Sequence, residues 1–127
     1  MRVESYETYR NPVHFDELPG EKKKLTEVQQ EIADDFIRSY DAGDRTPVLL
    51  HGITGSGKTE VYMEMIDAML QRGKQCIVLI PEIALTYQTL LRFYKRFGDA
   101  VSVMHSRLSA GERYDQMKRA KRGEVQV

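Results

Sequence analysis

The stretch that most constrains this chain is residues 48–59, which read VLLHGITGSGKT. An apolar segment typical of a buried strand leads into a glycine-rich turn, and the last two residues open a helix. The spacing G-x-x-x-x-G-K-[ST] is met by Gly52, Gly57, Lys58 and Thr59. Because glycine adopts backbone angles that a Cβ forbids, the turn can direct its N–H groups toward a phosphate chain. The stretch therefore predicts a strand, a phosphate-binding loop and a helix in succession.

The side chains at the end of this loop predict the chemistry of the bound ligand. The N-terminus of the following helix offers unpaired N–H donors and a partial positive charge to an anion. Lys58 can reach the β- and γ-phosphates of a nucleotide, and the Thr59 hydroxyl can ligate Mg²⁺. Lys58 and Thr59 are thus the predicted catalytic residues, and Thr59 is the predicted magnesium ligand. The residues predicted to contact the nucleotide are Gly52, Thr54, Gly55, Ser56, Gly57, Lys58 and Thr59.

Composition sets the broad class of the chain. Its 127 residues, 41% hydrophobic and 30% charged, are typical of one globular domain. No apolar run approaches the roughly 18 residues of a membrane span, and residues 1–5 lack the apolar core of a signal peptide. These features predict a cytoplasmic protein without a membrane partner. The single cysteine, Cys76, excludes a disulfide or a cysteine-rich zinc site within these residues.

Helix and strand patterns alternate along most of the chain. Residues 1–24 lack periodicity and predict an extended lead-in or linker, so the domain is expected over residues 25–127. Helices are expected from Thr26 to about Tyr40, from Lys58 to about Arg72, over 87–97 and over 110–122; strands are expected at 48–50, 75–80, 100–104 and, just starting, 124–127. This order predicts a mostly parallel sheet between two layers of helices, the α/β fold of a three-layer, RecA-like P-loop NTPase lobe. The lobe would be incomplete at its C-terminus.

Charge is unevenly distributed, although the net charge is zero. Residues 1–91 hold 10 Lys or Arg and 15 Asp or Glu, a balance of −5, whereas residues 92–127 hold 9 and 4, a balance of +5. A basic C-terminal third indicates a polyanionic partner beyond the nucleotide. From charge alone, the alternative is a solvated helix face.

Four stretches together resemble a known family. They are LTEVQ at 25–29, LLHGITGSGKTEVY at 49–62, IVLIPEIALTYQ at 77–88 and VMHSRLSAGERYDQMKRAKRG at 103–123. In combination they resemble the start of the motor of the bacterial replication-restart helicases of the PriA (primosomal protein N-prime) family. The resemblance implies part of an ATP-dependent superfamily 2 DNA helicase with 3′-to-5′ polarity that acts in primosome assembly.

The resemblance also implies roles for residues outside the phosphate loop. Gln29 would read the adenine edge of ATP, while the spacing of Thr26 and Gln29 also forms a helix-capping box. Thr86 would touch the phosphates of single-stranded DNA, for which an ordinary helix cap is the alternative. The DNA-binding residues predicted in this way are Thr86, His105, Ser106, Arg119 and Arg122.

Several parts of such a helicase are not found in these residues. The family carries an acidic D-E-x-H motif, a second motor lobe, a DNA-binding domain and a cysteine-rich zinc module. We therefore expect this chain to bind ATP with Mg²⁺ without hydrolysing it, and we expect zinc only in the parent protein. The implied partners are single-stranded or forked DNA and other primosome proteins. A P-loop kinase for small molecules and a non-catalytic nucleotide-binding module remain as alternatives.

Overall fold

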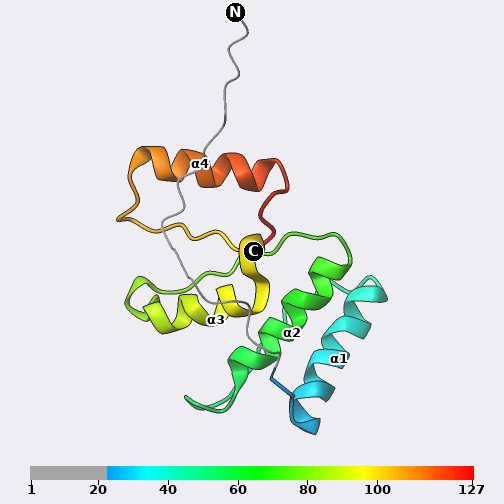
Figure 1. Cartoon of the computed structure of the whole chain (residues 1–127). Coiled ribbons are helices and arrows are strands. Elements are labelled where there is room, and N and C mark those ends of the chain that lie inside the picture. Colours follow the sequence, from blue (N-terminus) through cyan, green and yellow to red (C-terminus); the bar gives the residue numbers. More distant parts are fainter. Residues whose placement is uncertain (1–22) are drawn as a thin grey trace, which may run out of the picture. The chain divides into compact units, whose positions relative to one another are not determined.

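The computed structural model describes residues 23–127. The predicted lead-in of residues 1–24 therefore lies outside the described residues, except for its last two. Tertiary contacts divide the described chain into one unit over residues 23–76 and another over residues 77–127. Each unit is described by itself below, with the helix labels of Figure 1.

Helices account for all the regular structure of the described residues. The α-helices are α1 (Glu27–Asp41), α2 (Lys58–Gln71), α3 (Tyr87–Phe97) and α4 (Ala110–Lys121), and the 3₁₀ turns are η1 (Glu82–Ala84) and η2 (Gly98–Ala100). The helices predicted from periodicity are confirmed to within one or two residues at each end. Capping explains this agreement, because Thr26, Thr86 and Ser109 each accept a hydrogen bond from the backbone N–H three residues later.

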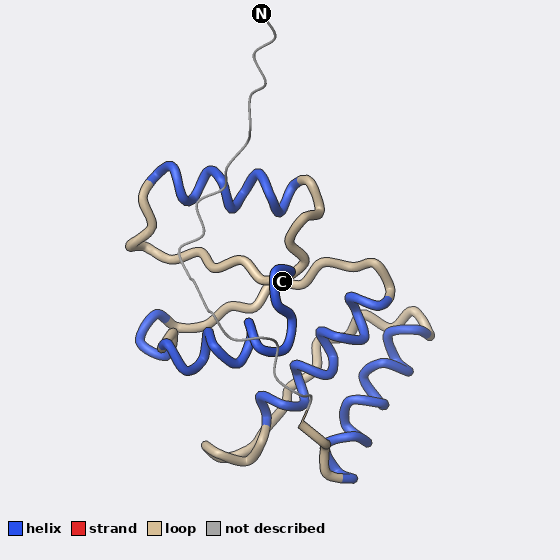
Figure 2. The backbone as a smooth tube through the Cα atoms, viewed as in Figure 1, coloured by secondary structure: helices blue, strands red, loops and turns tan. Residues whose placement is uncertain are grey.

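The predicted three-layer fold with a parallel sheet is wrong for this structure. Between residues 23 and 127 no residue lies in a strand, and Figure 2 shows only helix and loop there. The segments expected as the first two strands leave large side chains in solvent, with Leu49 87% and Leu79 90% exposed. A strand requires a partner that takes up its backbone hydrogen bonds. An apolar run without such a partner stays an extended loop.

The segments expected as the third and fourth strands do contact each other. Ser102 N donates to Val127 O at 2.8 Å, and Val127 N donates to Ala100 O at 3.0 Å. This reciprocal pattern occurs between parallel segments, but it extends over too few residues to form strands. Val101, Val103 and Val125 are buried beside it, so these two segments contribute to the core of their unit.

The unit of residues 23–76 is built on the packing of α1 against α2. Ala33 in α1 and Val61 and Ile66 in α2 are buried. At the C-terminal ends of the two helices, Arg72 donates Nε to Asp41 Oδ1 at 2.8 Å and NH2 to Asp41 Oδ2 at 2.6 Å. The hydrogen bond from Arg72 lowers the pKa of the Asp41 carboxyl below its usual value. This link between the helices is therefore present at neutral pH and lost when acid protonates Asp41.

The unit of residues 77–127 contains α3 and α4 with their preceding caps. The Ser109 N–H donates to Glu112 Oε2 at 2.8 Å, which completes a capping box at the start of α4. None of the helices described between residues 23 and 127 has the length and apolarity needed to cross a membrane.

Candidate nucleotide-binding site

The glycine-rich loop leads directly into α2, as the sequence predicts, although the segment before it is loop instead of strand. Gly57 is the N-cap residue of α2 and has φ +85°, and Gly55 has φ +80°. L side chains rarely adopt this left-handed region, so the conformation of the loop depends on glycine at both positions. The loop backbone therefore turns just before the N-terminus of α2, where N–H groups have no partner inside the helix.

Lys58 is held against the loop in the structure. Its Nζ donates to the carbonyl oxygen of Gly52 and, at 2.8 Å, to that of Ile53. The side chain thus folds back over the turn that precedes it. A bound phosphate would offer the ammonium group a charged acceptor in place of these neutral carbonyl groups. Within residues 23–127 the hydrogen bonds of the Lys58 ammonium group are thus with carbonyl oxygens of the loop and not with a carboxylate.

Gln29 joins the start of α1 to the same loop. Its Oε1 accepts from Thr26 N at 2.9 Å, which completes the predicted capping box, and its Nε2 donates to Gly57 O at 3.3 Å. A Cβ at Gly57 would lie 2.1 Å from Gln29 Nε2, so the close approach requires glycine. The contact with Gly57 was not anticipated from the sequence, because no spacing rule relates two residues this far apart.

Thr59, the predicted magnesium ligand, lies in the first turn of α2. Its Oγ1 accepts a hydrogen bond from the Tyr62 hydroxyl at 3.3 Å. Residues 23–127 contain no group of three His, Cys, Asp or Glu side chains that could hold a metal ion. A threonine hydroxyl is an oxygen ligand of the kind that Mg²⁺ takes beside nucleotide phosphates and water.

Three of the predicted DNA-binding residues, Thr86, His105 and Ser106, form hydrogen bonds within the unit of residues 77–127. Thr86 caps α3 by accepting from Thr89 N at 3.3 Å. His105 Nδ1 accepts from Arg107 N at 3.2 Å, and the Ser106 hydroxyl donates to the Glu82 carboxylate. The Glu82 contact, unpredicted from the sequence, brings the PEIALT segment to the loop that carries Ser106.

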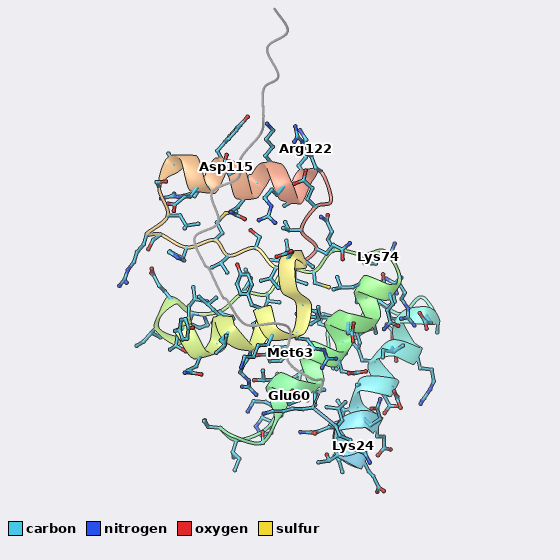
Figure 3. The ribbon with its side chains drawn as sticks, viewed as in Figure 1. Lys24, Glu60, Met63, Lys74, Asp115 and Arg122 are labelled. Atoms are coloured by element: carbon cyan, nitrogen blue, oxygen red, sulfur yellow. The ribbon has the colours of Figure 1, made fainter. Side chains whose placement is uncertain are left out.

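The two predicted DNA-binding arginines of the basic region differ in their surroundings. The Arg119 side chain is only 14% exposed, and its NH1 donates to Gln116 Oε1 at 3.2 Å. The Arg122 side chain is 44% exposed and lies 3.8 Å from a carboxylate oxygen of Glu124. Figure 3 shows Arg122 at the C-terminal end of α4. Arg122 is thus the more accessible cation, while Arg119 supports its own unit.

Comparisons with known proteins agree with the sequence motifs. The chain is 45% identical over 127 residues to replication restart protein PriA of Bacillus subtilis. The matched region covers 98% of this chain and 16% of that relative. It is 51% identical over 80 residues to the PriA protein of Synechocystis sp., covering 63% of this chain and 10% of the relative. The PriA protein of Chlamydia pneumoniae is 39% identical over 110 residues, or 87% of this chain and 15% of the relative.

These relatives confirm the resemblance to the PriA family, and the chain spans less than a fifth of the length of each. A family model described as "Type III restriction enzyme, res subunit" matches residues 22–127. That range includes the phosphate loop, the PEIALT segment and the whole of α4. Because this match covers most of the 127 residues of the chain, the chain belongs to the family described as type III restriction enzyme, res subunit.

Proposed function

We propose that this chain is the ATP-binding part of a DNA helicase that acts in replication restart. The observation that carries the proposal is the loop at the start of α2, where Gly55 and Gly57 have positive φ and Lys58 lies against the turn. Its relatives are named replication restart protein PriA, which supports this function over a P-loop kinase. The 3′-to-5′ direction, the primosome partners and a zinc site in the parent protein belong to the same proposal.

In this proposal, the residues of the loop bind and orient ATP. Backbone N–H groups of the loop and of the first turn of α2 donate to the phosphates. Lys58 exchanges its contacts with the Gly52 and Ile53 carbonyl groups for the β- and γ-phosphates. Thr59 supplies a hydroxyl ligand to Mg²⁺, which neutralises phosphate charge when bound. In the whole helicase, hydrolysis would then drive movement along DNA.

Thr86, His105, Ser106, Arg119 and Arg122 remain the proposed DNA-binding residues. Backbone contacts carry no base information, so we propose that they hold the phosphates of a single strand without sequence preference. The exposed Arg122 guanidinium is the best placed of the cations for this role. Arg119, which is less exposed and donates to Gln116, would make the weaker phosphate contact of the two arginines.

We expect this chain alone to bind ATP without turning it over. No D-E-x-H motif occurs in the sequence, and the proposed catalytic residues Lys58 and Thr59 supply no general base. Isothermal titration calorimetry with ATP and Mg²⁺ measures binding, and a phosphate-release assay on the same sample measures turnover. A folded chain that shows no heat of binding would contradict the proposed function. Steady phosphate release that disappears in Lys58→Ala would contradict only the expected lack of turnover.

We also expect Gln29 to contribute to the choice of base. Gln29→Ala should narrow the preference for ATP over GTP, because an amide can both donate to and accept from the adenine edge. Each polar atom of the amide keeps a second bonding position beside its contact with Thr26 or Gly57. Calorimetric titrations with ATP and GTP, each with Mg²⁺, measure the preference.

The control for this experiment is Gln29→Glu. A glutamate keeps the acceptor for the Thr26 N–H, as Glu112 does for Ser109 in α4, but it has no N–H to donate. It should therefore preserve the helix cap and still narrow the base preference. If both variants keep the ATP-to-GTP affinity ratio and only Gln29→Ala melts at a lower temperature, Gln29 is only a cap.

A further inference from the structure

Helix α4 buries polar side chains and exposes apolar ones. Asp115 and Gln116 are buried, and Gln116 is only 1% exposed. On the solvent side, Tyr114 is 64% exposed and Met117 is 58% exposed. A surface helix normally has the opposite arrangement. Helix α4 therefore presents two apolar side chains to solvent while it buries two polar ones.

A polar network explains which face of α4 turns inward. Gln116 Oε1 accepts a hydrogen bond from the Ser102 hydroxyl at 2.7 Å and another from Arg119 NH1 at 3.2 Å. Because a buried amide is costly unless it is hydrogen-bonded, these partners hold Gln116 inside the unit. Tyr114 and Met117 then have to face solvent.

The outward face also carries positive charge. With 3.6 residues per turn, Arg113, Tyr114, Met117 and Lys121 fall within an arc of about 100°, and Arg113 and Lys121 are about 12 Å apart along the helix axis. These four residues are all exposed and are called the α4 stripe below. The two carboxylates of the helix lie elsewhere, since Glu112 closes the capping box and Asp115 is buried. The stripe is therefore complementary to an anionic ligand that offers flat, apolar groups.

We propose that the α4 stripe binds single-stranded nucleic acid, with a base stacked on Tyr114 and neighbouring phosphates neutralised by Arg113 and Lys121. Exposed aromatic rings beside a cationic track are the usual platform for single strands, because every base presents a flat face. An acidic protein surface would meet the cations but would offer no regular flat partner to Tyr114. The inference rests on the proposed DNA-directed function.

The position of Arg113 connects the stripe to the proposed DNA-binding loop. Its Nε donates to Leu108 O at 3.2 Å, and its NH2 donates to Ser106 O at 3.3 Å. The guanidinium is thus held between α4 and the loop that carries His105 and Ser106. A single strand on the α4 stripe would continue toward these residues.

The test uses the 127-residue chain and two fluorescent oligonucleotides of equal length. One is oligo(dT), and the other is an abasic deoxyribose-phosphate chain that has the same charge but no bases. Anisotropy titrations at low salt should show tighter binding to oligo(dT). Tyr114→Ala should weaken binding to oligo(dT) about tenfold and leave binding to the abasic chain nearly unchanged. Tyr114→Phe, which keeps the ring, should bind like the parent chain.

Two further variants complete the design. Tyr87→Ala removes another exposed tyrosine, at the start of α3, and should leave binding to both oligonucleotides unchanged. Lys121→Glu should weaken binding to both oligonucleotides and reduce its salt dependence, because a phosphate contact is lost. Far-ultraviolet circular dichroism shows whether each variant keeps the helix content of the parent chain.

Three results would overturn the inference: equal oligo(dT) affinity of Tyr114→Ala and the parent, equal weakening by Tyr114→Ala on both oligonucleotides, or no binding of oligo(dT) by the folded parent. ATP binding is measured on the same preparations. Absence of ATP binding with an intact Tyr114 effect would refute the proposed nucleotide site and leave the α4 stripe standing.

Discussion

Replacing Lys58 with alanine is expected to weaken binding of ATP and ADP by about 1.5–3 kcal/mol, or roughly ten- to 150-fold. The loss follows from removal of a charge-assisted contact to the phosphates. The free chain loses the Lys58 contacts with the Gly52 and Ile53 carbonyl groups, but these carbonyl groups are exposed and water can replace them. We therefore expect the melting temperature to change little. Calorimetry and a thermal melt measure the two effects.

Lys74→Ala provides the matched control for this result. Lys74 follows the C-terminal end of α2, whereas Lys58 begins the helix, as the labels Lys74 and Glu60 in Figure 3 show. The two variants lose the same charge from the same unit. Equal nucleotide affinities of Lys58→Ala and Lys74→Ala would refute a phosphate-binding role for Lys58.

Replacing Gly57 with alanine is expected to reduce both stability and nucleotide binding. Alanine at φ +85° costs about 1–3 kcal/mol, because its Cβ crowds the backbone in the left-handed region. The new Cβ would also lie 2.1 Å from Gln29 Nε2, so the amide has to leave the Gly57 carbonyl group. Urea unfolding measures the loss of stability, and calorimetry with ATP measures the loss of affinity.

The variant Gly43→Ala separates the cost of the positive φ from the cost of the clash with Gln29. Gly43 has nearly the same angle, φ +88°, but a Cβ there would meet nothing within 4 Å. Gly43→Ala should lower the free energy of unfolding only by the cost of placing alanine at positive φ, and it should leave ATP affinity unchanged. In the double variant Gln29→Ala/Gly57→Ala the clash is absent, so its loss of stability should be smaller than the sum of the single losses. Strict additivity of the two substitutions would contradict the contact between Gln29 and Gly57.

The sequence by itself determined the features that depend on residues close together in the chain. The capping box at Thr26 predicted where α1 begins, and it is present. Glycines were predicted to shape the phosphate loop, and Gly55 and Gly57 do adopt positive φ. Such features are predictable because a cap or a tight turn is decided by hydrogen bonds and sterics within a few residues.

The tertiary structure alone decided which distant groups meet. The contacts of Gln29 with Gly57, of Asp41 with Arg72 and of Ser106 with Glu82 join residues more than 20 positions apart. No periodicity in the sequence relates such pairs. The burial of Gln116 against Ser102 likewise explains why Arg119, which donates to Gln116, is mostly shielded from solvent. It also explains why Tyr114 is exposed.

The predicted sheet, which residues 23–127 do not form, shows most clearly what the sequence determined and what only the tertiary structure decided. Apolar runs predicted four strands, yet Leu49 and Leu79 are exposed while Val103 and Val125 are buried. The runs look alike in the sequence, since apolar, β-branched residues only indicate a segment that fits a partly buried surface. Whether that surface exists depends on a neighbouring segment that accepts the backbone hydrogen bonds, which is a property of the folded chain and not of the run itself.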